Sequence, residues 1–354
     1  MTDDTPRPGL ACVPEPGPAP EPRPFTVEAA DGFPIRGFCW RHETPDRDRP
    51  VVIITAATSV RCRYYFRFAG FLYHQGFDAV VYDYRGIGES RPPRLAGFRG
   101  SWLDWGRLDF DAALVWTARQ FPARPIHVVA HSVGGFVIGL APSNHLISRI
   151  FTMGAQIAHW RDYAPRARLG MVAKWHVAMP LLTELFGYFP GGRLGWMEDT
   201  PRGVVRDWGW SRPRLEDTCR RGYLAVDLPD RRILIDQFRH VTAPILAVGV
   251  SDDPFGTVPA VERLLAYFEA APATHLRLTP DDVGEPSIGH FAFFHKRLAP
   301  ALWALPLTWL RTGALPERVP GTIVADGLRR REDPGAAAGA TTSPMPIAHA
   351  KGGQ

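Results

Sequence analysis

The chain has 354 residues, of which 45% are hydrophobic and 22% are charged, and it carries a formal net charge of +5. A chain of this length can bury the core of one large domain without disulfides. Its arginines alternate with acidic and aromatic residues and form no basic tract, which argues against nucleic acid as a partner. No run of about 18 apolar residues is present, so we expect no membrane span.

Cysteine spacing and the composition of the first residues indicate the cellular compartment. The four cysteines lie far apart and include no C-x-x-C pair, a pattern that predicts neither a zinc site nor a disulfide framework. The first residues are acidic and rich in proline, whereas a signal peptide needs a basic start and an apolar run. We therefore expect a cytoplasmic protein.

The two ends of the sequence differ in composition from the rest. Residues 1–24 are rich in proline, and residues 331–354 are rich in Gly, Ala, Ser and Thr. Segments of this kind bury too little apolar surface to offset the entropy lost on ordering. The sequence predicts disordered tails over residues 1–24 and 316–354.

The region between the tails begins with a hairpin and continues as alternating strands and helices. Asp31-Gly32 separates two short runs of strand-forming residues, 25–28 and 34–38, which predicts an antiparallel hairpin. Further strands are predicted directly before Ser132 and over residues 51–55, 79–84, 147–153, 244–250 and 274–278, and helices over residues 63–75, 105–120 and 259–270. This alternation predicts an α/β fold with a mostly parallel sheet and helices on both faces.

Residues 158–240 break the alternation. No clean strand is recognisable there, and the interval holds five of the eleven tryptophans. We predict an inserted segment that packs its apolar patches against the main domain.

A nucleophile-elbow pattern follows the strand before Ser132. This serine lies between Ala130 and Gly134 in the pattern A-x-S-x-G, where small residues on either side let the backbones approach in a sharp strand-to-helix turn. Alanine in place of the usual first glycine adds only one methyl group. The pattern predicts Ser132 as a nucleophile, and the alternative is an ordinary strand-to-helix turn.

Two further motifs resemble the α/β-hydrolase superfamily. Residues 83–90 read D-Y-R-G-I-G-E-S and match the loop after the fourth strand of that superfamily, in which Asp83 and Arg85 would tie the loop down. Downstream, the strand at residues 244–250 ends in two aspartates, and a histidine, His290, precedes the last helix. The order Ser, Asp, His is the one that this superfamily uses.

Together with the small-residue loop at residues 56–59 and Tyr64-Tyr65, these motifs resemble bacterial α/β-hydrolases of the serine-aminopeptidase and monoacylglycerol-lipase-like branch, over about residues 25–315. The resemblance implies the α/β-hydrolase fold, with a core domain formed by residues 25–157 and 241–315 and a helical cap over the active site at residues 158–240. The alternative for this insertion is a structural subdomain that does not contact substrate.

A catalytic triad is predicted from these residues. A serine hydroxyl needs a base to remove its proton, and His290 is the candidate because it lies on a loop and follows the acid in the chain. A carboxylate must orient the imidazole. The superfamily spacing, counted from the start of the preceding strand and from the following helix, favours Asp253, and a count from Gly249 favours Asp252. Asp109, on the helix before the elbow, is predicted to be a surface charge.

The chemistry also requires two N–H donors for the oxyanion. The residue after the nucleophile supplies one, which points to Val133. The other is expected from the loop after the strand at residues 51–55, which reads Ala-Ala-Thr-Ser here where many relatives have His-Gly. Because a backbone donor requires no given side chain, either Ala57 or Thr58 can serve.

These residues predict a serine hydrolase that cleaves a carboxylic ester, or alternatively a thioester or amide, through an acyl-enzyme formed on Ser132. No cofactor is needed, and the expected partner is a small-molecule acyl ester; the sequence defines neither that substrate nor the oligomeric state. Two alternatives use the same fold. An acyltransferase would share the triad, and a non-catalytic binding protein would be favoured by the loss of a triad member, none of which is lost here.

Overall fold

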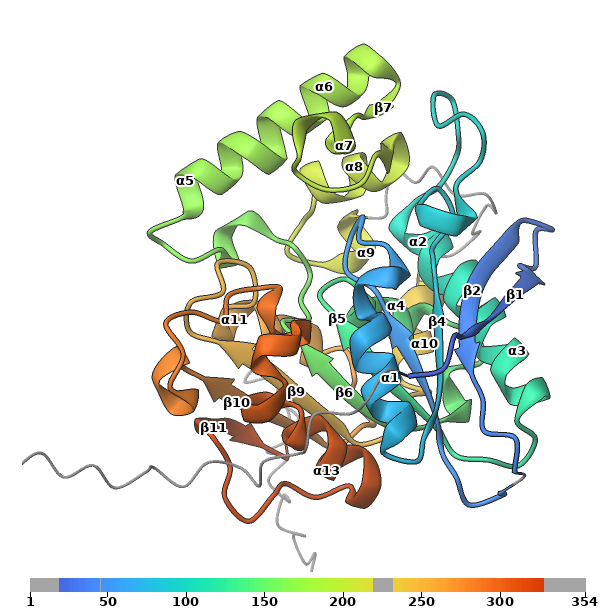
Figure 1. Ribbon diagram of the computed structural model, residues 1–354. Coiled ribbons are helices and arrows are strands. Elements are labelled where there is room, and N and C mark those ends of the chain that lie inside the picture. Colours follow the sequence, from blue (N-terminus) through green and yellow to red (C-terminus); the bar gives the residue numbers. More distant parts are fainter. Residues whose placement is uncertain (1–18, 45, 219–231, 328–354) are drawn as a thin grey trace, which may run out of the picture.

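A computed structural model describes residues 19–44, 46–218 and 232–327 (Figure 1). Within these residues, a nine-stranded sheet has the strand order β1-β2-β4-β3-β5-β6-β9-β10-β11. Its strands are β1 (Arg23–Glu28), β2 (Pro34–Trp40), β3 (Val51–Thr55), β4 (Asp78–Tyr82), β5 (Ile126–His131), β6 (Ile147–Met153), β9 (Ile245–Val250), β10 (Ala273–Leu278) and β11 (Thr322–Asp326).

The middle of the sheet is parallel, from β4 through β3, β5, β6 and β9 to β10, and the strands at its two edges are antiparallel. Every residue of β3 and β5 is buried, as expected for apolar strands that are covered on both faces. The predicted hairpin at Asp31-Gly32 and the predicted α/β architecture are confirmed.

Helices cover both faces of the sheet, and each predicted helix is present with altered ends. The helices are α1 (Phe66–His74), α2 (Trp102–Asp104), α3 (Asp111–Gln120), α4 (Gly134–Leu140), α5 (Arg168–Met171), α6 (Met179–Phe186), α7 (Gly191–Leu194), α8 (Arg202–Gly209), α9 (Leu215–Thr218), α10 (Arg232–Phe238), α11 (Val258–Leu265), α12 (Ala299–Leu302) and α13 (Ala304–Thr312). The predicted helix at 63–75 begins as a 3₁₀ turn, η1 (Cys62–Tyr65), and the one at 105–120 begins as a π-helical turn, η3 (Trp105–Phe110).

The inserted segment follows β6. Its helices from α5 to α8 stand above the carboxyl ends of the central strands (Figure 1). It also contains a two-stranded ribbon, β7 (Tyr188–Phe189) and β8 (Thr200–Pro201), which is too short to leave a periodic pattern. Its last helix, α10, packs instead against α4 of the core, where the Phe238 ring fills the space beside Gly139.

The described ends correct the predicted tails. Residues 316–327 were expected to be disordered, but they include β11, which pairs with the edge strand β10. Residues 19–24 are also ordered, since β1 begins at Arg23 and the Trp40 Nε1 donates to the Pro20 carbonyl. Backbone pairing accounts for both cases, because β1 pairs with β2 and β11 pairs with β10 although the side chains of β1 and β11 are largely exposed. The remainder of each predicted tail lies outside the described residues.

The loop at residues 83–90 has the structural role expected of it. Asp83 accepts hydrogen bonds from the Cys62 and Glu89 N–H groups, and Arg85 pairs with Asp31 and Asp109 at 2.6 Å each. Asp109 is therefore not a surface charge but a fully buried partner of Arg85. Over the described ranges, no helix is both long and apolar enough to span a membrane.

Candidate active site

Ser132 occupies a strained turn between β5 and α4. Its φ of 54° lies in the left-handed region, which is costly for a residue with a side chain. The approach that the turn requires is visible at Gly134, where an added Cβ would lie 2.6 Å from the Thr55 hydroxyl oxygen. The serine is almost buried, with 6% exposure. This is the geometry that the A-x-S-x-G pattern predicts for an elbow.

His290 and Asp253 are brought together from two loops that follow β9 and β10. The His290 Nδ1 lies 2.7 Å from the Asp253 Oδ2, and both side chains are buried. Burial raises the pKa of Asp253, but the His290 ring and the N–H groups of Gly256 and Phe255 outweigh that effect and hold this pKa below its ordinary value. The carboxylate is therefore charged at neutral pH and faces the imidazole.

Asp252 lies next in the chain but has a different set of partners. Its two carboxylate oxygens accept hydrogen bonds from the N–H groups of Ile288 and Gly289, at 3.0 and 2.9 Å. It therefore contacts the backbone of the loop that carries His290, whereas Asp253 contacts the imidazole itself.

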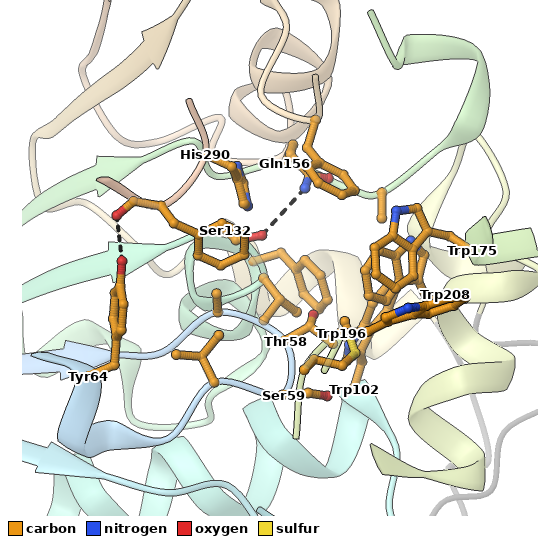
Figure 2. Close-up of a pocket in the computed structure, with 18 residues that line it drawn as sticks. Thr58, Ser59, Tyr64, Trp102, Ser132, Gln156, Trp175, Trp196, Trp208 and His290 are labelled. Atoms are coloured by element: carbon orange, nitrogen blue, oxygen red, sulfur yellow. Dashed lines mark hydrogen bonds between the residues drawn. The ribbon is translucent and has the colours of Figure 1, made fainter. Parts of the chain in front are cut away.

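Ser132 and His290 face the same cavity, together with Gln156 (Figure 2). The Gln156 Nε2 donates a long hydrogen bond of 3.5 Å to the Ser132 Oγ. Sequence reasoning did not single out Gln156. It follows β6, which pairs with β5 in parallel, so the carboxyl ends of both strands meet at one edge of the sheet. A polar residue directly after the small pair Gly154-Ala155 was the available signal.

The predicted oxyanion donors lie around the same cavity, but they are not equivalent. The Ala57 N–H donates to the Tyr65 hydroxyl at 3.0 Å and is therefore occupied. Within residues 19–44, 46–218 and 232–327, the N–H groups of Thr58 and Val133 form no hydrogen bond. Both residues line the cavity beside Ser132.

The cavity has a volume of about 330 Å³ and an aromatic wall. The wall is formed by Trp102, Phe136, Trp175, Trp196, Trp208 and Phe255. The Trp175 and Trp208 rings stack with their centroids 4.7 Å apart, and Figure 2 shows them opposite the Ser132 hydroxyl. No Asp, Glu, Lys or Arg is found among the described residues that line this space.

The inserted segment is joined to the core at the rim of this cavity. The Thr200 and Ser59 hydroxyl oxygens lie 2.6 Å apart, which ties the segment to the loop that carries Thr58. The buried Asp207 of α8 accepts a hydrogen bond of 2.8 Å from the Trp102 N–H of α2. The segment thus supplies part of the cavity wall and contacts two parts of the core, the loop at residues 56–59 and α2.

Comparison with known proteins gives a family match over part of the chain. A family model described as serine aminopeptidase, S33, matches residues 46–180, which include Ser132. The chain has the α/β-hydrolase fold. No curated protein matches the sequence of this chain.

Two solved structures share the fold of this chain at low sequence identity. A puromycin hydrolase is 17% identical with a TM-score of 0.51, and the match covers 86% of this chain and 41% of that one. DcsB, solved with a substrate analogue, is 16% identical with a TM-score of 0.50, covering 78% and 94% of the two chains.

Proposed function

We propose that the protein hydrolyses uncharged carboxylic esters through an acyl-enzyme formed on Ser132. The observation that carries the proposal is the Asp253 to His290 hydrogen bond of 2.7 Å, at a cavity into which the strained Ser132 also projects. In this proposal His290 is the general base and Asp253 orients its ring. The N–H groups of Val133 and Thr58 stabilise the oxyanion.

The reaction then follows from these positions. As the Ser132 Oγ forms a bond to the ester carbonyl carbon, its proton moves to His290, and the carbonyl oxygen becomes an oxyanion. When the tetrahedral intermediate collapses, the bond to the alcohol oxygen breaks and His290 returns the proton to that oxygen. Water repeats the sequence on the acyl-enzyme and releases the acid.

The cavity wall supports an apolar acyl group as the substrate class. An aminopeptidase would need an acceptor for the charged α-amino group of its substrate, and the described lining contains no carboxylate. Aromatic rings favour burial of an aliphatic or aromatic acyl chain. We infer that residues 158–218 form the cap expected within residues 158–240, because Trp175, Trp196 and Trp208 supply much of the wall.

Labelling with a fluorophosphonate tests the nucleophile. Wild-type protein and the Ser59→Ala variant are expected to react, because Ser59 also lines the cavity but its hydroxyl pairs with that of Thr200. The Ser132→Ala variant is expected to lose the label while it keeps its circular dichroism spectrum. Undiminished labelling of that variant would contradict the proposal.

A substrate panel tests the reaction. We expect hydrolysis of p-nitrophenyl esters that carry butyryl, octanoyl or benzoyl groups, and no hydrolysis of aminoacyl p-nitroanilides. The opposite preference would indicate a peptidase. Release of p-nitrophenol that depends on an added alcohol, with a new ester as product, would indicate an acyltransferase.

A further inference from the structure

Two consecutive tyrosines of η1 connect the loop at residues 56–59 to the loop that carries His290. The Tyr64 hydroxyl donates to the Phe291 carbonyl at 2.7 Å (Figure 2). The Tyr65 hydroxyl lies 2.7 Å from the His131 Nδ1, and the His131 Nε2 lies 2.8 Å from the His290 carbonyl oxygen. The tyrosines thus reach two successive carbonyl groups of the His290 loop, one directly and one through His131.

The direction of each hydrogen bond in the second connection follows from the chemistry of its groups. A carbonyl oxygen can only accept, so the His131 Nε2 must carry a proton and donate it. Burial, with a further contribution from the nearby His290 ring, lowers the pKa of His131 to about 3, so the ring is neutral and its Nδ1 is an acceptor. Burial also raises the pKa of Tyr65 well above its ordinary value, so its hydroxyl keeps its proton and donates.

The Tyr65 hydroxyl oxygen can still accept a hydrogen bond, and the Ala57 N–H donates to it at 3.0 Å. Every donor in this series therefore has one acceptor. Tyr65 and His131 have no exposed surface, and the Phe294 ring contacts both of them. Water has no room to replace a missing partner in these buried hydrogen bonds. They therefore fix the distance between the Ala57 N–H and the His290 carbonyl.

We propose that Tyr65 and His131 are positioning residues. They set the position of the His290 imidazole relative to the loop at residues 56–59, which carries the Thr58 N–H. The proposal deepens the proposed function and rests on it, because His290 matters to the reaction only as its base. Neither residue contacts substrate. Their effect is transmitted through the His290 carbonyl at one end and the Ala57 N–H at the other.

Kinetics of matched variants test this role. Tyr65→Phe removes the hydroxyl that joins Ala57 to His131, and we expect kcat for a p-nitrophenyl ester to fall about tenfold or more with KM within about twofold. Tyr84→Phe is the control, because Tyr84 is also buried and donates to the neighbouring Ala56 carbonyl but has no contact with His131. Equal kcat values for these two folded variants would overturn the proposal.

Replacement of His131 tests its contact with Tyr65 separately from its contact with the His290 carbonyl. It also tests the proposal if Tyr65→Phe does not fold. Glutamine places an amide N–H near the position of the imidazole Nε2, and asparagine places an acceptor near that of Nδ1. His131→Gln can still donate to the His290 carbonyl and is expected to keep more of the wild-type kcat than His131→Asn. The reverse order would contradict the proposal.

A spectroscopic measurement distinguishes failure of this proposal from failure of the proposed function. In ¹H–¹⁵N spectra of the imidazole nitrogens, His131 should be the neutral Nε2–H tautomer at pH 7 and should remain so at pH 5, whether or not any ester is cleaved. The His131→Gln variant assigns the signal. A protonated ring at pH 5, or the Nδ1–H tautomer, would overturn the hydrogen-bond directions.

Discussion

Asp252 and Asp253 hold the His290 loop by different groups, although they are adjacent in the chain. Asp253 accepts from the imidazole, and Asp252 accepts from two backbone N–H groups of the same loop. Replacing either residue therefore changes the position or charge of the imidazole, but only Asp253 faces the proton that the ring must keep on Nδ1.

We expect Asp253→Asn to lower kcat by about 10³-fold or more, because the amide can hold the wrong imidazole tautomer and cannot stabilise the imidazolium. Asp252→Asn keeps one acceptor oxygen for the loop and should lower kcat by roughly tenfold or less. Steady-state hydrolysis of p-nitrophenyl butyrate by both variants measures the difference. A larger loss in Asp252→Asn would assign the orienting role to Asp252.

For single residues, the sequence narrows each role to a few candidates and does not identify their partners. Two adjacent aspartates at a strand end fit the superfamily spacing almost equally, and only the loop conformation separates their contacts. The same holds for Ala57 and Thr58, since a backbone N–H carries no side-chain signal and its availability depends on the distant Tyr65 hydroxyl. The contact of His131 with the His290 carbonyl likewise has no sequence signature.

Among the elements, the junction between α8 and α2 carries a buried carboxyl group. Asp207 is buried and has no cationic partner among the described residues. Burial raises the pKa of Asp207 to about 7, the Trp102 N–H lowers it and the nearby Asp104 raises it. The folded protein therefore favours the neutral form of Asp207 over a pH range in which the unfolded chain is already ionised.

The pH dependence of stability tests this junction. Because the pKa of Asp207 is raised on folding, its contribution to stability is fully present below the unfolded value of about 3.8 and is lost as pH rises toward 7. Asp207→Asn removes this loss and can still accept from Trp102. We expect the variant to gain about 4 kcal/mol in free energy of unfolding, relative to wild type, between pH 4 and pH 8.

Urea unfolding at the two pH values gives this difference, with Asp48→Asn as a control on an exposed loop residue. A gain that does not change between pH 4 and pH 8 would show that Asp207 titrates as it does in the unfolded chain.

For the whole molecule, the antiparallel strand β11 closes one edge of the sheet. It pairs with β10, which is otherwise a parallel strand beside β9. An unpaired edge exposes backbone N–H and carbonyl groups that can pair with another molecule. The strand therefore bears on both stability and solubility, although it contributes little to the core.

Truncation at two positions measures its contribution. A chain that ends after residue 327 should keep the melting temperature of the full chain, whereas one that ends after residue 315 should melt roughly 5 °C lower and scatter more light. Thermal unfolding followed by circular dichroism and static light scattering checks both outcomes. Equal melting temperatures for the two shortened chains would mean that β11 adds no stability.

The fold as a whole was predictable from hydrophobic periodicity, because buried runs such as residues 51–55 and 245–250 alternate with amphipathic helices. The elements that were missed depend on the folded context. The ribbon of β7 and β8 has two residues per strand, and β11 is exposed at almost every side chain. The helix α10 lies in the interval assigned to the insertion and packs on the core, which composition does not reveal.

Because several tryptophans line the cavity, intrinsic fluorescence can report its occupancy. Four of its eleven tryptophans, Trp102, Trp175, Trp196 and Trp208, border the same space. An apolar molecule that enters this space would displace water from these rings and move their emission to shorter wavelength. Binding in the cavity can then be followed in unlabelled protein, in real time and without turnover, from the wavelength of tryptophan emission.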